Sequence, residues 1–494
     1  DKNGLIKRSR KLLKKSSIKK NFIYQASYEI LLIALPILTS PYVSRVLGAS
    51  NIGIYSYTYT IAFYFTLFAA LGIKNYGNRE ISRCRDNQEE LNKTFSSILF
   101  LHVIISSIVL IGYFGYCVLW AKEEYTFYFV IQSLYLIGTL FDISWLFFGL
   151  ELFKTTVMRN TIIRISSVIL IFVLVKDAGD LWKYIFILAF SNFASQIYLW
   201  FKIKKLVKIV KVERKEIFKH LTQMSILFIP TIAVSFYNYM DKIMLGALAG
   251  TTELGFYENS FKITTVCSSV IGSVGTVMLP RMSNMVAKGD TEASKKYIRI
   301  SIECVMVMAC AMAFGISGIS HDFAPIFWGK GFSECGILLA LLAIYLPVQG
   351  FASVLRTQYL IPNRWDKQYT ISLCIGAIVN VVINYLLIPQ FHAVGAVIGT
   401  IAAETSVCVA QALFVSKCLP IKTYIMQSIP FICIGAIMFG VIRGIEVFMH
   451  TSIATLMVQI VIGAIVYVVL SLGYVIVTKH ELYDIWKREI RKKA

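Results

Sequence analysis

Long apolar stretches follow one another along almost the whole chain, separated by short polar segments. Most are about 20 residues long, the length that a helix needs to cross a hydrocarbon core of about 30 Å. A membrane β-barrel would instead show alternating segments of about ten residues. The pattern predicts fourteen transmembrane helices, at 22–47, 52–73, 95–119, 125–150, 156–175, 182–201, 223–246, 256–280, 300–318, 336–360, 369–388, 394–416, 424–442 and 453–477.

The composition agrees with this pattern. Hydrophobic residues make up 57% of the 494 residues, charged residues only 16%, and the mean hydropathy is +0.67. A soluble surface cannot be built from so few charged residues. We therefore expect an all-α integral membrane protein.

The distribution of lysine and arginine predicts the orientation. With the N-terminus inside, 39 of the 49 basic residues fall in segments on the cytoplasmic side and five in segments on the outer side. Positive charges near helix ends are retained in the cytoplasm. Both termini are thus predicted to be cytoplasmic, in a multi-pass membrane protein. The net charge of +21 then reflects topology and not nucleic-acid binding.

The sequence lacks the common signatures of catalysis and of metal binding. It contains no nucleotide-binding glycine loop, no HExxH motif and no serine elbow. The ten cysteines show no metal-binding spacing and resemble small packing residues. We therefore expect no cofactor, no metal and no enzymatic activity.

An internal repeat divides the chain. RVLGASNIGIYSYTYTI at 45–61 resembles IMLGALAGTTELGFYENSFKI at 243–263, with Gly48 and Gly246 in equivalent LGA motifs. Six helices in each copy predict two pseudo-symmetric lobes, as in transporters with parallel repeats. The expected segments are a basic cytoplasmic arm (1–21), an N-lobe (22–201), a basic linker (202–222), a C-lobe (223–416), two further helices (417–478) and a basic cytoplasmic tail (479–494).

With Arg159 and Lys183, which lie at the ends of their spans, counted in the flanking segments, eleven charged residues fall within the predicted spans. A charge at mid-membrane depth costs at least about 2.5 kcal/mol, so each is expected to face protein, water or a ligand. Arg356 and Glu303 lie near the cytoplasmic end, where a long side chain reaches the interface. The full set is Arg45, Arg164, Lys242, Lys262, Arg356, Glu29, Asp142, Asp241, Glu258, Glu303 and Glu404.

Lys262 is the strongest candidate for binding an anion, because it lies too deep to reach the interface easily. Glu258 precedes it by four residues and would neutralise it in part. Arg45 lies near the outer end of the first predicted helix, and the adjacent residues Asp241 and Lys242 lie near the outer end of the seventh. At these positions a side chain that reaches to the membrane interface is as compatible with the sequence as one that binds substrate.

Asp142 and Arg164 are predicted at similar depths on adjacent helices. A structural ion pair and a functional role are equally compatible with the sequence. Asp142, Glu404 and Asp241 are also candidates for ion coupling, although each acid would equally serve to neutralise a nearby base.

Tyrosines cluster in the second predicted helix, in the stretch YSYTYTIAFYFT at 55–66. Helical spacing places Tyr55 and Tyr59 on one face and Tyr57 and Tyr64 on another. An interfacial aromatic belt explains Tyr55 and Tyr57 but not Tyr64 at mid-depth. Tyr59 and Tyr64 are therefore the candidates to line a cavity.

Several of these motifs carry a family resemblance. TSPYVSRVLGASNIGIYSYTYTIAFYF, followed by LGIKNYGNREI, resembles the oligosaccharide flippases of the Wzx type. These belong to the multidrug/oligosaccharidyl-lipid/polysaccharide exporter superfamily, with the multidrug and toxin extruders (MATE) and the lipid II flippases. GTVMLPRMSNMVAKGD at 275–290 is similar to the equivalent junction in lipid II flippases.

The resemblance implies a MATE-like fold with alternating access. The implied substrate is an undecaprenyl-pyrophosphate-linked oligosaccharide for capsule, O-antigen or exopolysaccharide synthesis, and polysaccharide polymerase and chain-length proteins are implied partners. The cations that lipid II flippases place on their helices 1, 2 and 8 match this chain at Arg45 and Lys262, and no basic residue lies in its helix 2.

The sequence is compatible with two alternatives. A multidrug antiporter would use acids to attract organic cations. A membrane-embedded sugar polymerase would place catalytic groups in an outer loop, and the longest such loop, 317–334, contains His321 and Asp322.

The predicted orientation is testable by labelling single cysteines in a cysteine-free protein. Cysteines at 88, 210 and 290 are expected to react only after permeabilisation, and those at 122, 251 and 330 from outside, because the positive charges hold the first group in the cytoplasm. Outside labelling at 210 would contradict the lobe assignment.

Overall fold

The computed structural model describes residues 18–204 and 206–478. The predicted arm at 1–21 lies outside this range up to residue 17, as does all of the predicted tail at 479–494. Within the described residues the chain is helical and contains no β-strand. A first compact unit ends at Ser235 and a second begins at Phe236.

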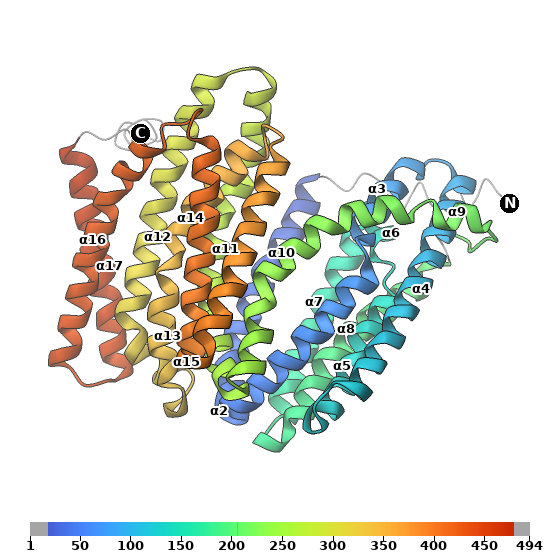
Figure 1. Ribbon diagram of the computed structural model, residues 1–494, viewed down its shortest axis with the longest axis horizontal. Helices are drawn as coiled ribbons and strands as arrows, with labels where there is room; N and C mark the ends of the chain where they lie inside the picture. Colours follow the sequence, from blue (N-terminus) through green and yellow to red (C-terminus); the bar gives the residue numbers. More distant parts are fainter. Residues whose placement is uncertain (1–17, 205, 479–494) are drawn as a thin grey trace. The chain divides into compact units, whose positions relative to one another are not determined.

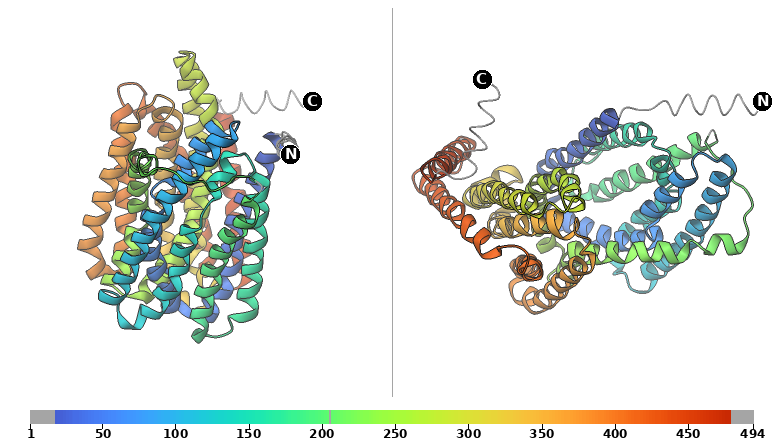
Figure 2. Two further views of the ribbon diagram at one scale, coloured as in Figure 1. Left: turned by 90° about the vertical axis from the view of Figure 1, so that its right-hand side faces the viewer. Right: turned by 90° about the horizontal axis from the view of Figure 1, so that it is seen from above.

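The helices of the first unit run alongside one another (Figures 1 and 2). In chain order its elements are α2 (Ile18–Ala70), α3 (Ile73–Cys84), α4 (Gln88–Leu119), α5 (Glu123–Leu140), α6 (Ser144–Gly149), α7 (Phe153–Leu174), the 3₁₀ turn η1 (Ala178–Asp180), α8 (Leu181–Ile203), α9 (Arg214–Phe218) and the first half of α10 (Leu221–Leu248). The short helices α3, α6 and α9 lie at one end of this unit (Figure 1).

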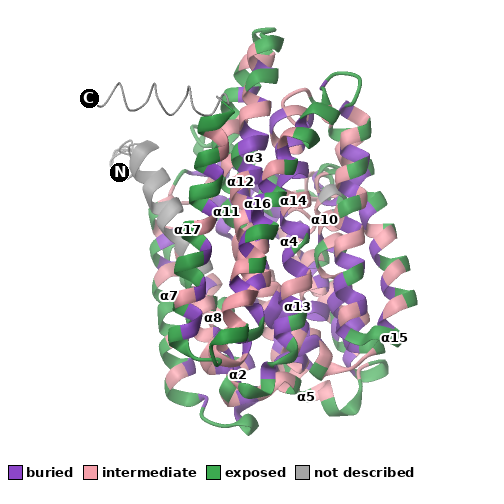
Figure 3. Cartoon of the chain, turned by 90° about the vertical axis from the view of Figure 1, so that its left-hand side faces the viewer, coloured by how far each residue is buried: buried purple, intermediate pink, exposed green. Residues whose placement is uncertain are grey.

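The second unit is organised around α12. This helix packs against α13, α14, α16 and α17, and exposed residues run along the outward faces of the helices (Figure 3). Beyond α10, its elements are α11 (Thr251–Ala287), α12 (Thr291–Phe327), the 3₁₀ turn η2 (Lys330–Phe332), α13 (Glu334–Ala343), α14 (Tyr345–Leu355), the π-helical turn η3 (Arg356–Leu360), α15 (Asp366–Val415), α16 (Ile421–Phe448) and α17 (Ile453–Val477).

The described helices confirm a multi-pass membrane protein. Eleven of them are long and apolar enough to cross a membrane, or twelve with α9 and α10 counted as one bent span. Two of the eleven contain a residue with non-helical backbone angles, Gly48 in α2 and His392 in α15. The exact number of fourteen spans stays a prediction.

In both copies of the sequence repeat the bend lies at a glycine five residues before the glycine of the G-x-Y motif, at Gly48 before Gly53 and at Gly250 before Gly255. In the first copy the LGA glycine, Gly48, has φ 77° and ψ 169°, a conformation that essentially only glycine adopts. In the second copy Gly246 lies inside α10, and Gly250, with φ 94° and ψ 173°, separates α10 from α11. The aligned glycines therefore do not have the same structural role.

A tightly packed core joins the short helices of the first unit to α4. Trp145 on α6 is fully buried and stacks on Phe95 of α4, with 5.3 Å between ring centroids. Its indole N–H donates to the carbonyl of Asp142 over 3.0 Å. Gly77 of α3 lies directly against the indole, because a Cβ at this position would come within 2.6 Å of the ring.

Substituting Gly77 by alanine is therefore expected to destabilise the protein. The buried indole has no room to move, and overpacking of this kind costs about 1–3 kcal/mol. Thermal unfolding of the purified protein measures the effect. The matched control is Gly112→Ala on α4, where nothing lies within 4 Å of an added Cβ. A Gly77→Ala protein as stable as Gly112→Ala would refute the close packing.

Candidate functional site

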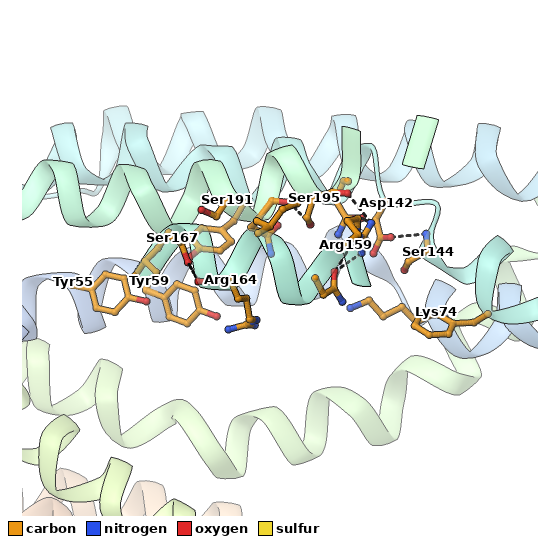
Figure 4. Close-up of a pocket in the computed structure, with 17 residues that line it drawn as sticks. Tyr55, Tyr59, Lys74, Asp142, Ser144, Arg159, Arg164, Ser167, Ser191 and Ser195 are labelled. Atoms are coloured by element: carbon orange, nitrogen blue, oxygen red, sulfur yellow. Dashed lines mark hydrogen bonds between the residues drawn. The ribbon is translucent and has the colours of Figure 1, made fainter. Parts of the chain in front are cut away.

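A polar cavity of about 410 Å³ lies among the helices of the first unit. Its volume falls in the range of small-molecule sites, about 300–1,000 Å³. Residues from α2, α3, α5, α6, α7 and α8 line it (Figure 4). We call it the first-unit cavity; its lining residues are Tyr55, Tyr59, Lys74, Tyr135, Asp142, Ser144, Phe148, Arg159, Asn160, Ile163, Arg164, Ser167, Leu188, Ser191, Asn192, Ser195 and Gln196.

Helical spacing explains why these residues meet. On α7 the lining residues follow a period of three to four, from Arg159 and Asn160 through Arg164 to Ser167. On α8 a polar face repeats in the same way, at Ser191, Asn192, Ser195 and Gln196. Polar groups on otherwise apolar helices are expected to turn away from lipid.

Tyrosines form one wall of the cavity. Tyr55 and Tyr59 lie one turn apart on α2, and their rings stack with centroids 5.6 Å apart and an interplanar angle of 23°. Tyr135 of α5 meets Tyr59 edge-on at 5.3 Å. Tyr57 instead packs against Tyr125 and Phe129, on the other face of α2. The predicted division of the tyrosines into two faces is thus confirmed for Tyr55, Tyr57 and Tyr59.

Three bases line the cavity, and they differ in how far their donors are used. Arg159 is buried; its guanidinium donates to the carbonyl of Ser195 at 2.7 Å and to the Asn160 side chain at 2.7 and 3.0 Å. The Arg164 guanidinium makes no hydrogen bond or ion pair with any described residue, and it projects beside the Tyr59 ring (Figure 4). The Lys74 side chain is exposed at the other end.

Asp142 is the single acid of the cavity lining. One of its carboxylate oxygens accepts from the backbone N–H of Ser144 at 2.8 Å. Among the described residues no ion pair joins Asp142 to Arg164, so the structural pair considered from the sequence is not formed. The cavity therefore has three bases to one acid, and its charge suits an anionic ligand.

Lys74, Arg159 and the polar face of α8 are functional candidates that the sequence pattern did not single out. The two bases lie near helix ends and were counted among the charges that set the topology. The spacing of SNFASQ at 191–196, with polar residues at i, i+1, i+4 and i+5, would have revealed the α8 face.

Lys242, Glu258 and Lys262 meet in the second unit. Glu258 on α11 forms an ion pair with Lys242 of α10 at 2.8 Å and a longer ion pair with Lys262, one turn further along α11, at 3.6 Å. The Lys242 ammonium group also lies over the rings of Tyr239 and Phe261. Glu258 thus neutralises one of the two lysines, and Lys262 is the more exposed, with 31% of its side-chain surface accessible against 10% for Lys242.

Asp241 forms a separate, buried polar contact beside this cluster. One carboxylate oxygen accepts from Tyr257 of α11 at 2.6 Å and from Thr400 of α15 at 3.0 Å. The other oxygen has no hydrogen-bond partner within the described part of the chain. The recorded contacts of Asp241 are therefore with Tyr257 and Thr400, and they are separate from the ion pairs of Glu258.

The remaining predicted residues lie elsewhere. Tyr64 is buried and donates to the backbone carbonyl of Ser235 at 3.0 Å, so it has a packing contact and does not line the first-unit cavity. Arg45 lies exposed on α2, three residues before Gly48, and is also outside the cavity lining. Glu404 is half-buried on α15, with Tyr237 and Arg356 as electrostatic neighbours.

His321 and Asp322, noted in the longest predicted outer loop, lie at the end of α12. His321 Nδ1 is 2.8 Å from a Glu446 carboxylate oxygen, and Asp322 accepts from Thr451 and Gln459. Arg443 also pairs with Glu446. These contacts join α12 to α16 and α17. His321 and Asp322 thus have a structural role in packing these helices together.

Comparisons with known proteins agree with the fold and the sequence motifs. Residues 18–286 match the model of a family described as "Polysaccharide biosynthesis protein". The chain is 26% identical over 376 residues to a "Putative O-antigen transporter" of Shigella dysenteriae, covering 75% of this chain and 92% of that protein. A protein of the same name from Escherichia coli K12 is 23% identical over 406 residues, covering 81% and 97%.

A solved structure shows the same fold at low sequence identity. The lipid II flippase MurJ in an inward closed conformation superposes with a TM-score of 0.75 at 16% identity, covering 92% of this chain and 99% of that one. The resemblance to flippases of the multidrug/oligosaccharidyl-lipid/polysaccharide exporter superfamily is confirmed. Since the family model spans more than half of the sequence, the chain belongs to the polysaccharide biosynthesis protein family.

Proposed function

We propose that the protein is a flippase that moves undecaprenyl-pyrophosphate-linked oligosaccharide repeat units from the inner to the outer leaflet of the bacterial cytoplasmic membrane. The observation that carries this proposal is the first-unit cavity, which combines three bases with a tyrosine wall and many hydroxyl and amide groups. Phosphate groups bind fixed cations, and sugars bind hydroxyl, amide and aromatic groups. The two relatives named as O-antigen transporters support the same substrate class.

The rest of the proposed scheme follows from the sequence. Fourteen spans, in two six-helix lobes with two additional helices, would alternate between inward and outward access, with both termini in the cytoplasm. A polysaccharide polymerase and the chain-length machinery would receive the product. Asp241, Asp142 and Glu404 are proposed sites of ion coupling; Asp241 is supported by its buried carboxylate oxygen without a partner.

The multidrug antiporter and the sugar polymerase are less well supported. An organic cation would meet three bases and one acid in the first-unit cavity. A polymerase would need reactive groups in an outer loop, and His321 and Asp322 are engaged in contacts between helices. We therefore propose transport without catalysis.

Deleting the gene tests the proposed function directly. A lipid-linked oligosaccharide is expected to accumulate on the cytoplasmic leaflet, because synthesis continues while translocation stops. Mass spectrometry of extracted lipids identifies the sugar. A sugar-specific lectin added to sealed membrane vesicles reports which leaflet carries it. Unchanged leaflet distribution together with impaired export of an organic cation would favour the antiporter instead.

Arg164→Gln is expected to reduce transport of the oligosaccharide about ten- to a hundred-fold in reconstituted vesicles. A hydrogen bond to a charged group is worth about 1.5–3 kcal/mol, and Arg164 has no partner among the described residues that would use its donors first. The matched control is Lys93→Gln, an exposed base on α4 whose ion pair with Glu89 is remote from the cavity lining. Equal transport by Arg164→Gln and Lys93→Gln would contradict the assignment of Arg164 to the binding site.

Lys262 is proposed as a further anchor for the pyrophosphate. Lys262→Ala is expected to leave insertion and thermal stability near normal while abolishing most transport, and Lys262→Arg to retain a measurable fraction. Glu258→Gln should be milder than loss of the Lys262 charge, because it leaves both lysines in place. Normal transport by a well-expressed Lys262→Ala protein would contradict this assignment and leave Arg164 or Arg45 as the anchor.

A further inference from the structure

A second, smaller cleft opens in the first unit between α3 and α10. Its volume is about 300 Å³, and it is lined by Arg79, Arg83, Gln223, Ile226 and Leu227. Both helices approach closely here: the Cβ that an alanine would add at Gly72, just before α3, would lie 3.1 Å from the carbonyl oxygen of Met224 on α10. We call it the α3–α10 cleft. It shares no lining residue with the first-unit cavity.

The two arginines of the cleft retain unused donors. Arg79 donates through Nε to Glu80 at 3.2 Å and through Nη2 to Gln223 at 3.0 Å, and Arg83 donates to Glu80 at 3.1 Å. A guanidinium has five N–H donors, so most remain available on both side chains. Glu80 balances one of the two positive charges, which leaves the cleft with a net positive charge.

A buried network fixes the position of Arg79. Its guanidinium lies over the Tyr76 ring, 5.4 Å from the ring centroid. The Tyr76 hydroxyl lies 2.5 Å from His220 Nδ1, and the other ring nitrogen of His220 lies 2.8 Å from the Ser97 hydroxyl. Since Tyr76, His220 and Ser97 are all buried, the arginine rests on a rigid support. A preorganised cation loses little entropy when it binds a ligand.

The wall on α10 is apolar and continues beyond the cleft. Ile226 and Ile229 each expose 60% of their surface, and Leu227 is half-buried. Polar and apolar groups thus lie side by side at the end of the unit that also holds α3 and α9 (Figure 1). A free anion would use the arginines alone, whereas an amphiphile would use both surfaces. The basic residues of the preceding linker would attract an anionic membrane surface to the same end; they are Lys208, Lys211, Arg214, Lys215 and Lys219.

We propose that the α3–α10 cleft binds the phosphate group of an anionic phospholipid, with Arg79 and Arg83 on the headgroup and an acyl chain along Ile226 and Ile229. Arginine matches phosphate oxygens through paired N–H donors, which a lysine cannot do. The bound lipid would hold the beginning of α10 against α3. This lipid is a constituent of the membrane and is distinct from the transported substrate.

The test is lipid binding to the purified full chain, measured by native mass spectrometry in detergent. Phosphatidylglycerol is expected to bind more tightly than phosphatidylcholine, and Arg79→Gln/Arg83→Gln to weaken phosphatidylglycerol binding by about tenfold or more, as expected for loss of charge-assisted bonds. The matched control is Arg85→Gln; Arg85 follows α3 directly, pairs with Glu151 at 2.6 Å and does not line the cleft. The control should bind phosphatidylglycerol like the unmodified chain.

A second variant guards against misfolding of the first. Gln223→Glu is expected to weaken phosphatidylglycerol binding as well, because its carboxylate would neutralise Arg79 in place. A free phosphate ion is the other ligand that the two arginines could bind, so inorganic phosphate is added as a competitor. It should not displace the lipid, because it makes no contact with the apolar wall. Equal binding of the two lipids, unchanged binding by both variants, or displacement by phosphate alone would each overturn the proposal.

Discussion

The absence of water from the hydrocarbon core is the constraint on which the rest of the structure depends. Backbone groups satisfy it by forming helices, and polar side chains satisfy it by turning toward one another. In the first unit the polar faces of α7 and α8 and the tyrosines of α2 meet around one cavity. In the second unit Glu258 holds two lysines, and Asp241 accepts from a tyrosine and a threonine. The same physical demand thus explains both the candidate site and the buried polar contacts.

The length of the apolar stretches and the helical spacing of residues within them made most of the architecture predictable. Long apolar stretches predicted a helical multi-pass protein, and an i,i+4 spacing predicted that Tyr55 and Tyr59 share a face and that Glu258 pairs with Lys262. These features depend on neighbours within one helix. Alignment of the LGA motifs misplaced the bend of the second copy, because the segment between LGA and G-x-Y is longer there and the glycine with positive φ is Gly250 and not Gly246.

The composition of the cavity was only partly predictable, for a physical reason. A base near a helix end serves equally as a topology signal or as a ligand for an anion, and only packing between helices decides which. Arg164 and Asp142 were recognised because they interrupt apolar stretches, whereas Lys74 and Arg159 were not. Tyr64 illustrates the converse: its depth suggested a cavity, but its hydroxyl meets the backbone of α10.

Arg159 has a further consequence for the first-unit cavity. Its guanidinium joins α7 to the Ser195 carbonyl of α8 and to Asn160, so these two helices are held at a fixed separation by a charged bracket. The contacts of Arg159 thus fix the wall of the cavity from which the exposed Arg164 side chain projects. Because Arg164 is exposed, an arriving anion would exchange with water at donors that no described residue uses. The packing of α7 against α8 therefore determines that the cavity favours an anion.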